Sequence, residues 1–326
     1  MPVRNRFAEL LPEIIAWRRD FHAHPELLYD LPRTAARVAA LLRGFGLDEV
    51  AEGVGGSGVV GVIRGRHDRT GRMIGLRADM DALPIRERTG LPYASRNEGV
   101  MRACGHDGHT AMLLGAARYL AETRNFDGSV VVIFQPAEEG GAGARAMLED
   151  GLLARWPVAE FYGMHNMPGQ PTGSFAICTG PIMAAADEFE IILTGKGGHA
   201  AKPHEGVDTT LVAAQVIVAL QSLVSRNLDP LHSGVVSVCV VETDSRAHNV
   251  IPQVVRLKGT ARSLDPAVRD LLRRGIGRVA DGIAAAHGAR AELHYADGYP
   301  VTRNDPEATR HAAEVARQVA GEVRLD

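Results

Sequence analysis

The feature that most constrains the fold of this chain is the alternation of short apolar runs with helical segments over its first 165 residues. The runs are flanked by glycine or charged residues, and the segments between them carry apolar residues at helical spacing. Strands are expected at 58–63, 73–76, 129–134 and 161–164, and helices at 7–24, 33–45 and 110–120. Strands that alternate with helices form a largely parallel sheet with covered faces, so the pattern predicts an α/β domain.

The pattern changes near Ala186, where a strand, a helix, two strands, a helix and a last strand follow one another. This order is typical of a compact α+β sandwich of the ferredoxin type. The chain length also favours two domains. We assign residues 186–299 to the second domain, and residues 1–185 plus 300–326 to the first. Residues 300–326 are assigned to the first domain because the last expected helix has no obvious partner in the second.

Composition argues against several classes of protein. The net charge of -3 gives no electrostatic reason to expect a nucleic-acid or membrane partner. No segment approaches the roughly 18 uninterrupted apolar residues that a membrane span needs, and the N-terminal segment has the pattern of an amphipathic helix and not of a signal peptide. The three cysteines are far apart and fit a reducing compartment, where a thiolate can bind a metal. We therefore expect a cytoplasmic enzyme.

Possible metal ligands and acid–base groups occur at four places where a predicted strand ends or a helix begins. They are Asp79 with Asp81, Cys104 with His106, Glu138 with Glu139, and His165. Each group alone is compatible with a structural role, such as a turn, a helix cap or a solvated acidic pair. Because ligands gather at the carboxyl ends of strands in open α/β sheets, the four groups together predict one site.

The residue types at these places indicate a metal centre. A mixture of thiolate, imidazole and carboxylate ligands suits Zn²⁺, Mn²⁺, Co²⁺ or Ni²⁺ better than Mg²⁺ or Ca²⁺. One carboxylate of the Glu138–Glu139 pair could bind a metal while the other takes a proton from a water molecule. Of His106 and His109, one could be a ligand and the other could orient a ligand.

The motifs RADMDALP, ACGHDGHTAM, QPAEEGG and GMHN resemble those of the aminoacylase/carboxypeptidase superfamily of dinuclear metallopeptidases. The branch that they resemble contains hippurate hydrolases, N-acyl-amino-acid amidohydrolases and plant auxin-conjugate hydrolases. The motifs GKGGHAAKPHEGVD, HNVIP and GTAR are similar to the smaller domain of that branch. The resemblance implies a mostly parallel-sheet catalytic domain, an inserted ferredoxin-like dimerisation or lid domain, and two divalent metal ions. The implied reaction cleaves the amide bond of an N-acyl or N-aroyl amino acid.

The resemblance also implies a role for each matched residue of the first domain. Glu138 would be the general base and later the acid that protonates the leaving amine, and Asp81 would orient a ligand. The implied metal ligands are Cys104, His106, Glu139 and His165.

In the second domain the resemblance implies groups that act on the substrate. His199 looks like a lid histidine that reaches the site of a partner subunit and stabilises the oxyanion. Asn249 and Arg262 match positions near the oxygen atoms and the carboxylate of the substrate. Relatives are typically dimers through this domain, and the edge of its sheet could pair across a two-fold axis, so we expect a homodimer through residues 186–299.

The chain departs from the resemblance at its C-terminal end. The relatives' catalytic domain continues further and usually supplies a last histidine ligand. The other histidines in the second half of the chain do not lie in the matching context; they are His232, His248, His287, His294 and His311. A catalytically impaired dimeric binding protein is therefore an alternative, as is a dipeptidase or carboxypeptidase of the same superfamily.

Overall fold

The computed structural model describes residues 3–321 and 324–325 and divides into two compact units, Met1–Gln170 and Pro171–Asp326. Each unit has its own hydrophobic core, as expected of two domains. The first unit contains, in chain order, α1 (Val3–Ala23), α2 (Pro32–Gly44), β1 (Glu49–Val54), β2 (Gly58–Arg64), β3 (Met73–Asp79), α3 (His106–Thr123), β4 (Ser129–Gln135), α4 (Gly143–Glu149), α5 (Leu152–Arg155) and β5 (Val158–Gly163).

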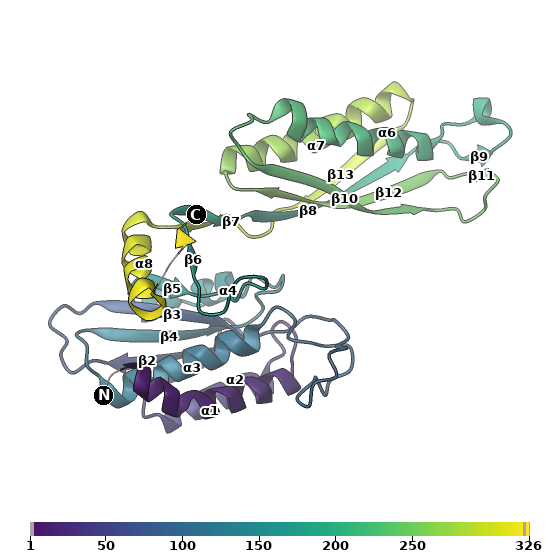
Figure 1. Ribbon diagram of the computed structural model, residues 1–326. Coiled ribbons are helices and arrows are strands. Elements are labelled where there is room, and N and C mark those ends of the chain that lie inside the picture. The colour runs from purple at the N-terminus through teal and green to yellow at the C-terminus, as the bar shows by residue number, and fades with distance from the viewer. Residues whose placement is uncertain (1–2, 322–323, 326) are drawn as a thin grey trace. The chain divides into compact units, whose positions relative to one another are not determined.

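A five-stranded sheet in the order β1-β2-β4-β3-β5 forms the centre of the first unit (Figure 1). Strands β3, β4 and β5 run parallel, whereas β2 pairs antiparallel with β4 and with β1. The predicted α/β class is confirmed, but the sheet is mixed because β2 runs antiparallel to β4. The sequence analysis missed β1, which forms a hairpin with β2. The carboxyl ends of the three parallel strands, at Asp79, Gln135 and Gly163, lie along one edge.

Helices cover both faces of this sheet. Figure 1 shows α1, α2 and α3 on one face and α4 on the other. Alternate residues of β4 point to opposite faces: Val132 and Phe134 join the cluster under α1–α3, and Val131 and Ile133 join the cluster with Met147 of α4. Burying a side chain of this kind stabilises the fold by roughly 1.5–3 kcal/mol. The packed strands therefore hold the loops at their carboxyl ends in fixed positions.

The second unit contains a four-stranded antiparallel sheet in the order β10-β12-β8-β13. Its chain order of strand, helix, two strands, helix and strand confirms the predicted ferredoxin-like arrangement. The helices α6 and α7 cover one face (Figure 1), and Asp208 and Asp265 cap their first turns. These elements are β8 (Ala185–Thr194), α6 (Thr209–Ser222), β10 (Gly234–Thr243), β12 (Val254–Ser263), α7 (Pro266–Ala286) and β13 (Arg290–Ala296).

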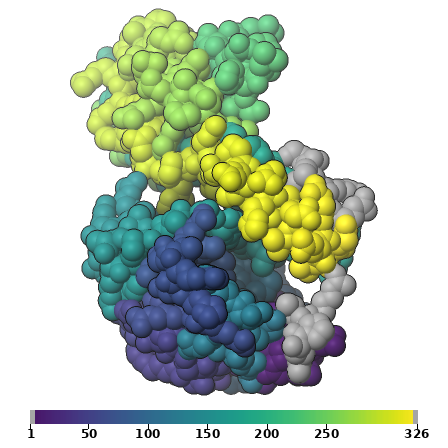
Figure 2. Space-filling model, turned by 90° about the vertical axis from the view of Figure 1, so that its left-hand side faces the viewer, coloured from purple at the N-terminus to yellow at the C-terminus, as the bar shows by residue number. Residues whose placement is uncertain are grey.

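Shorter elements complete the second unit. Strand β14 pairs with β7, β15 with β6 and β11 with β9, and α8 lies at the surface (Figure 2, yellow). The assignment of residues 300–326 to the same domain as residues 1–185 stays a prediction. The shorter elements are β6 (Ala176–Ile177), β7 (Gly180–Met183), β9 (Gly198–His199), η1 (Pro203–Glu205), η2 (Leu223–Asn227), β11 (Val250–Ile251), β14 (Thr302–Asn304), α8 (Pro306–Ala320) and β15 (Arg324–Leu325).

One helical stretch of the described residues, Thr209–Asn227, is long and apolar enough to cross a membrane by length and composition. Its residues Val212, Val216 and Leu220 are buried in the core against the four-stranded sheet. A core helix passes the same test of length and composition, so this stretch is weak support for a membrane span.

Candidate metal centre

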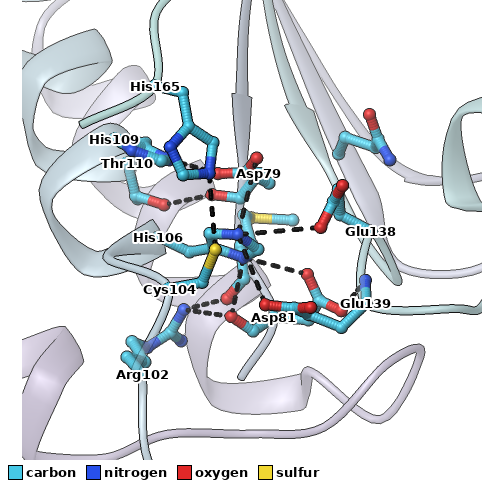
Figure 3. A network of polar contacts seen from close by, with 12 residues as sticks. Asp79, Asp81, Arg102, Cys104, His106, His109, Thr110, Glu138, Glu139 and His165 are labelled. Atoms are coloured by element: carbon cyan, nitrogen blue, oxygen red, sulfur yellow. Dashed lines mark hydrogen bonds and ion pairs between the residues drawn. The ribbon is translucent and has the colours of Figure 1, made fainter. Parts of the chain in front are cut away.

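The polar groups singled out in the first domain converge at the carboxyl edge of β3, β4 and β5 (Figure 3). The possible ligand atoms of Cys104, His106 and His165 lie within 4.8 Å of one another. Those of His106, Glu138 and Glu139 also lie within 4.8 Å of one another. The structure thus brings these side chains together, and their roles in binding and catalysis stay predictions.

His106 begins α3 and is fully buried. Its Nδ1 lies 3.0 Å from the backbone oxygen of Asp81 and 3.2 Å from Asp81 Oδ1. Both oxygen atoms are acceptors, so Nδ1 carries the proton and is the hydrogen-bond donor. The other nitrogen, Nε2, is buried but has no hydrogen-bond partner among the residues that the structure describes. Asp81 thus aims the Nε2 atom of His106 into the centre of the cluster.

Carboxylates surround this unpartnered nitrogen. His106 Nε2 lies 3.7 Å from Asp79 Oδ2 and 3.7 Å from Glu139 Oε1. Glu138 Oε2 is 3.8 Å away. The Oε1 atom of Glu139 is also buried, and no described residue forms a hydrogen bond with it. Buried polar atoms normally have partners, so a ligand held between these two atoms would account for both.

The Cys104 thiol contacts the imidazole of His165, with 3.3 Å between Sγ and Nε2. The neighbouring imidazoles of His106 and His165 lower the pKa of Cys104, although burial opposes this shift. The thiolate is the form in which cysteine binds metals. The turn before α3 and the loop after β5 therefore bring a sulfur and a nitrogen ligand together.

The two glutamates lie on a sharply turned loop after β4. Ala137, directly before them, has a φ of +48°, which is uncommon for a residue other than glycine. Asp81 Oδ2 accepts a hydrogen bond of 3.0 Å from the backbone N–H of Glu139 and so holds this loop. The Glu138 side chain is 36% exposed and that of Glu139 is 18% exposed. Glu139 is thus better placed to bind an ion, and Glu138 to meet a solvent molecule.

The electrostatics of the cluster favour a cation. Burial opposes the charged form of His106, but its hydrogen bond to Asp81, the neighbouring Cys104 thiol and the neighbouring carboxylates raise its pKa to about 10. The hydrogen bond with Cys104 raises the pKa of His165 to about 9. Burial raises the pKa of Glu139. A divalent cation would compete with these protons for the same donor atoms.

The residues present fit a metal ion. The imidazole of His106 is anchored through Nδ1 to a carboxylate, which is how metal-binding histidines are usually oriented. The two buried atoms without partners, His106 Nε2 and Glu139 Oε1, face the same space. The thiolate, imidazole and carboxylate donors suit Zn²⁺, Mn²⁺, Co²⁺ or Ni²⁺.

The other predicted residues lie in the second unit. His199 in β9 pairs with Val250 in β11, and Ala200 donates a backbone hydrogen bond of 3.0 Å to Asn249, so His199 and Asn249 lie on neighbouring segments. Both are exposed. Arg262 lies apart from them on β12, where its Nη1 contacts Thr260 and the backbone oxygen of Ala261. The substrate roles of these residues stay predictions.

Sequence reasoning missed the part that Arg102 plays in supporting the cluster. This arginine is 2% exposed and donates to the backbone oxygens of Met80 and Phe21 and to Thr34 Oγ1. It thereby fixes the backbone next to Asp81. The only signal for it was a charged residue directly before the Cys104 motif, and that signal does not reveal which carbonyl groups it binds.

Comparison with known proteins identifies the family. The profile of peptidase family M20/M25/M40 matches residues 75–326, which is most of the chain. The chain belongs to this peptidase family. This M20/M25/M40 chain is 44% identical to hippurate hydrolase of Campylobacter jejuni, over 96% of the chain and 82% of that protein. It is 42% identical to N-acetylcysteine deacetylase of Bacillus subtilis, over 94% of the chain and 80% of that protein.

Solved structures agree with this membership of the M20/M25/M40 family. The chain superimposes with a TM-score of 0.81 and 37% identity on the Bacillus subtilis YXEP protein, described as a dinuclear metal binding peptidase from the M20 family. The match covers 96% of the chain and 81% of that protein. The resemblance that the sequence motifs indicated is thereby confirmed.

Proposed function

We propose that this chain is a metal-dependent amidohydrolase that cleaves the amide bond of N-acyl or N-aroyl amino acids. One observation carries the proposal: two buried ligand-type atoms, His106 Nε2 and Glu139 Oε1, have no hydrogen-bond partner among the described residues and lie 3.7 Å apart beside the carboxylate of Glu138. The similarity to a hippurate hydrolase and to an N-acetylcysteine deacetylase supports the choice of substrate class.

Two divalent cations would be held by Cys104, His106, Glu139 and His165. When bound, such ions lower the pKa of water and polarise a carbonyl group. Asp81 keeps the proton of His106 on Nδ1 and fixes the Glu139 backbone, so both ligands face the site before an ion arrives.

Glu138 does the proton chemistry. Its carboxylate takes a proton from the attacking water as the C–O bond forms, and delivers that proton to the amine nitrogen as the C–N bond breaks. The products are a free carboxylic acid and a free amino acid. In the second unit, His199 would reach the site of the partner subunit and donate a hydrogen bond to the developing oxyanion there, while Asn249 and Arg262 would bind the oxygen atoms and carboxylate of the substrate.

The assembly and the compartment are also part of this proposal. The edge strand β10 has one unpaired side in the four-stranded sheet and exposes Val235 and Val241, which supports a homodimer through residues 186–299. The Cys104 thiol must stay reduced to bind a metal, and this supports a cytoplasmic location.

The test is amino-acid release by purified protein from benzoylglycine, N-acetylcysteine and a dipeptide, each with added Zn²⁺, Mn²⁺ or Co²⁺ and with a chelator. We expect the acylated amino acids to be hydrolysed and the chelator to abolish the reaction. Faster hydrolysis of the dipeptide would favour the peptidase alternative. Metal binding without hydrolysis of any substrate would favour the binding-protein alternative.

A further inference from the structure

His109 lies beside the candidate ligands, and we propose that it is a positioning residue that fixes the loop carrying His165. This inference rests on the proposed metal-dependent function. His109 follows His106 on the first turn of α3 and is 3% exposed. Its ring packs against that of His165, with 4.6 Å between the centroids and an interplanar angle of 64° (Figure 3).

Both ring nitrogens of His109 are engaged by protein groups. The backbone N–H of Asn166 lies 3.0 Å from Nε2. A backbone N–H can only donate, so Nε2 accepts and Nδ1 carries the proton. Nδ1 lies 2.7 Å from Asp79 Oδ1, which accepts that proton. His109 therefore has no free lone pair for a metal, although its possible ligand atom lies within 4.8 Å of those of Asp79 and His106.

Asp79 ties His109 to the central sheet. The carboxylate of Asp79 accepts a hydrogen bond of 2.8 Å from Arg77, and the backbone oxygen of Asp79 accepts one of 2.8 Å from Thr110. Arg77 also donates to Gln135 at the end of β4, at 2.8 Å. A continuous set of hydrogen bonds thus runs from two strands through His109 to the backbone directly after His165.

A close contact holds the same loop from the other side. Gly105, between Cys104 and His106, has a φ of +94°, and a Cβ added there would lie 2.4 Å from Asn166 Oδ1. The loop after β5 therefore packs directly on the turn that carries Cys104. Held between His109 and Gly105, the loop places His165 Nε2 3.3 Å from Cys104 Sγ.

Without this support, His165 would have to be ordered when the metal binds. Its side chain is exposed. Besides the contacts above, it has a T-shaped contact with the ring of His106, with 6.3 Å between the centroids, and a hydrogen bond between its Nδ1 and the backbone oxygen of Asn166. Loss of a residue that orients a metal ligand typically weakens metal binding by about 10–100-fold.

Two substitutions separate the two contacts of His109. In H109N, the amide can keep the hydrogen bond to Asp79 but does not reach the N–H of Asn166. In H109Q, the amide oxygen can reach that N–H, but the bond to Asp79 is lost. The matched control is H287N, which removes the hydrogen bond of 2.8 Å between His287 and Gln215 in the second unit.

The experiment measures Zn²⁺ and Co²⁺ dissociation constants by chelator competition, the thiolate-to-cobalt absorption band, and thermal unfolding of the metal-free proteins. We expect H109N to raise the dissociation constants about 10–100-fold and to alter the cobalt band. H109Q should raise them less and H287N not at all.

Unchanged affinity in H109N would overturn the proposal, and so would an equal loss of affinity in H287N. If H109N does not fold, H109Q carries the test, and wild-type affinity in H109Q would overturn it. A wild-type protein that binds no metal would reject the proposed function itself, and this inference with it. Normal wild-type binding together with unchanged variants would reject only the role of His109.

Discussion

Asp81 is the residue whose substitution tests the organisation of the metal centre most sharply. Its side chain is fully buried and accepts two hydrogen bonds, one from His106 Nδ1 at 3.2 Å and one from the Glu139 N–H at 3.0 Å. In D81N the amide has almost the same shape, but its NH2 group cannot accept. One of the two donors therefore loses its side-chain acceptor: either the Glu139 N–H is left unpaired, or His106 Nδ1 keeps only the backbone oxygen of Asp81.

A hydrogen bond to a charged group contributes about 1.5–3 kcal/mol, so we expect D81N to weaken metal binding about 10- to 100-fold. The assay is chelator competition together with metal-free thermal unfolding. The matched control is D187N, because Asp187 is equally buried and accepts hydrogen bonds from Arg269, Tyr295 and the Gly298 N–H in the second unit. Wild-type metal affinity in D81N, or an equal loss in D187N, would refute the reasoning.

Three further predictions concern catalysis, stability and assembly. E138Q should bind metal normally but reduce kcat about 10²–10⁴-fold. If its steady-state rates at saturating metal match those of the wild type, Glu138 is not the base. Burial opposes the charge of Asp187, but hydrogen bonds from Arg269 and Tyr295 prevail and lower its pKa. The charged carboxylate should therefore stabilise the fold above about pH 4, and this stabilisation should disappear as the pH falls through the lowered pKa. Urea unfolding of wild type and D187N should therefore converge in acid, and a difference independent of pH would contradict this. Sedimentation should show a homodimer, and only monomer at micromolar concentration would reject it.

The placement of the metal centre could be predicted because it follows from strand direction. Parallel strands end at the same edge, so polar groups after β3, β4 and β5 had to meet there. The helix expected at 33–45 is observed at Pro32–Gly44, one residue earlier at each end, because proline is typical of a helix start and glycine of the position after a helix end.

Other features depend on contacts that no local pattern contains. The strand Glu49–Val54 carries two glutamates without regular alternation, and it exists because it pairs with β2. The role of Arg102 depends on backbone oxygens from distant segments, and that of His109 on the N–H of Asn166, which is 57 residues away. Sequence patterns give the residue types at a site, whereas the hydrogen bonds that orient them appear only in the folded chain.

The central claim is that Cys104, His106, Glu139 and His165 hold divalent cations beside Glu138. Anomalous X-ray scattering from crystals of the protein grown with Zn²⁺ tests it most directly. We expect two peaks about 3.5–4 Å apart, with His106 Nε2 and Glu139 Oε1 at about 2.0–2.2 Å from a cation and Cys104 Sγ at about 2.3 Å. Cations bound only elsewhere, or density that leaves His106 Nε2 uncoordinated, would contradict it.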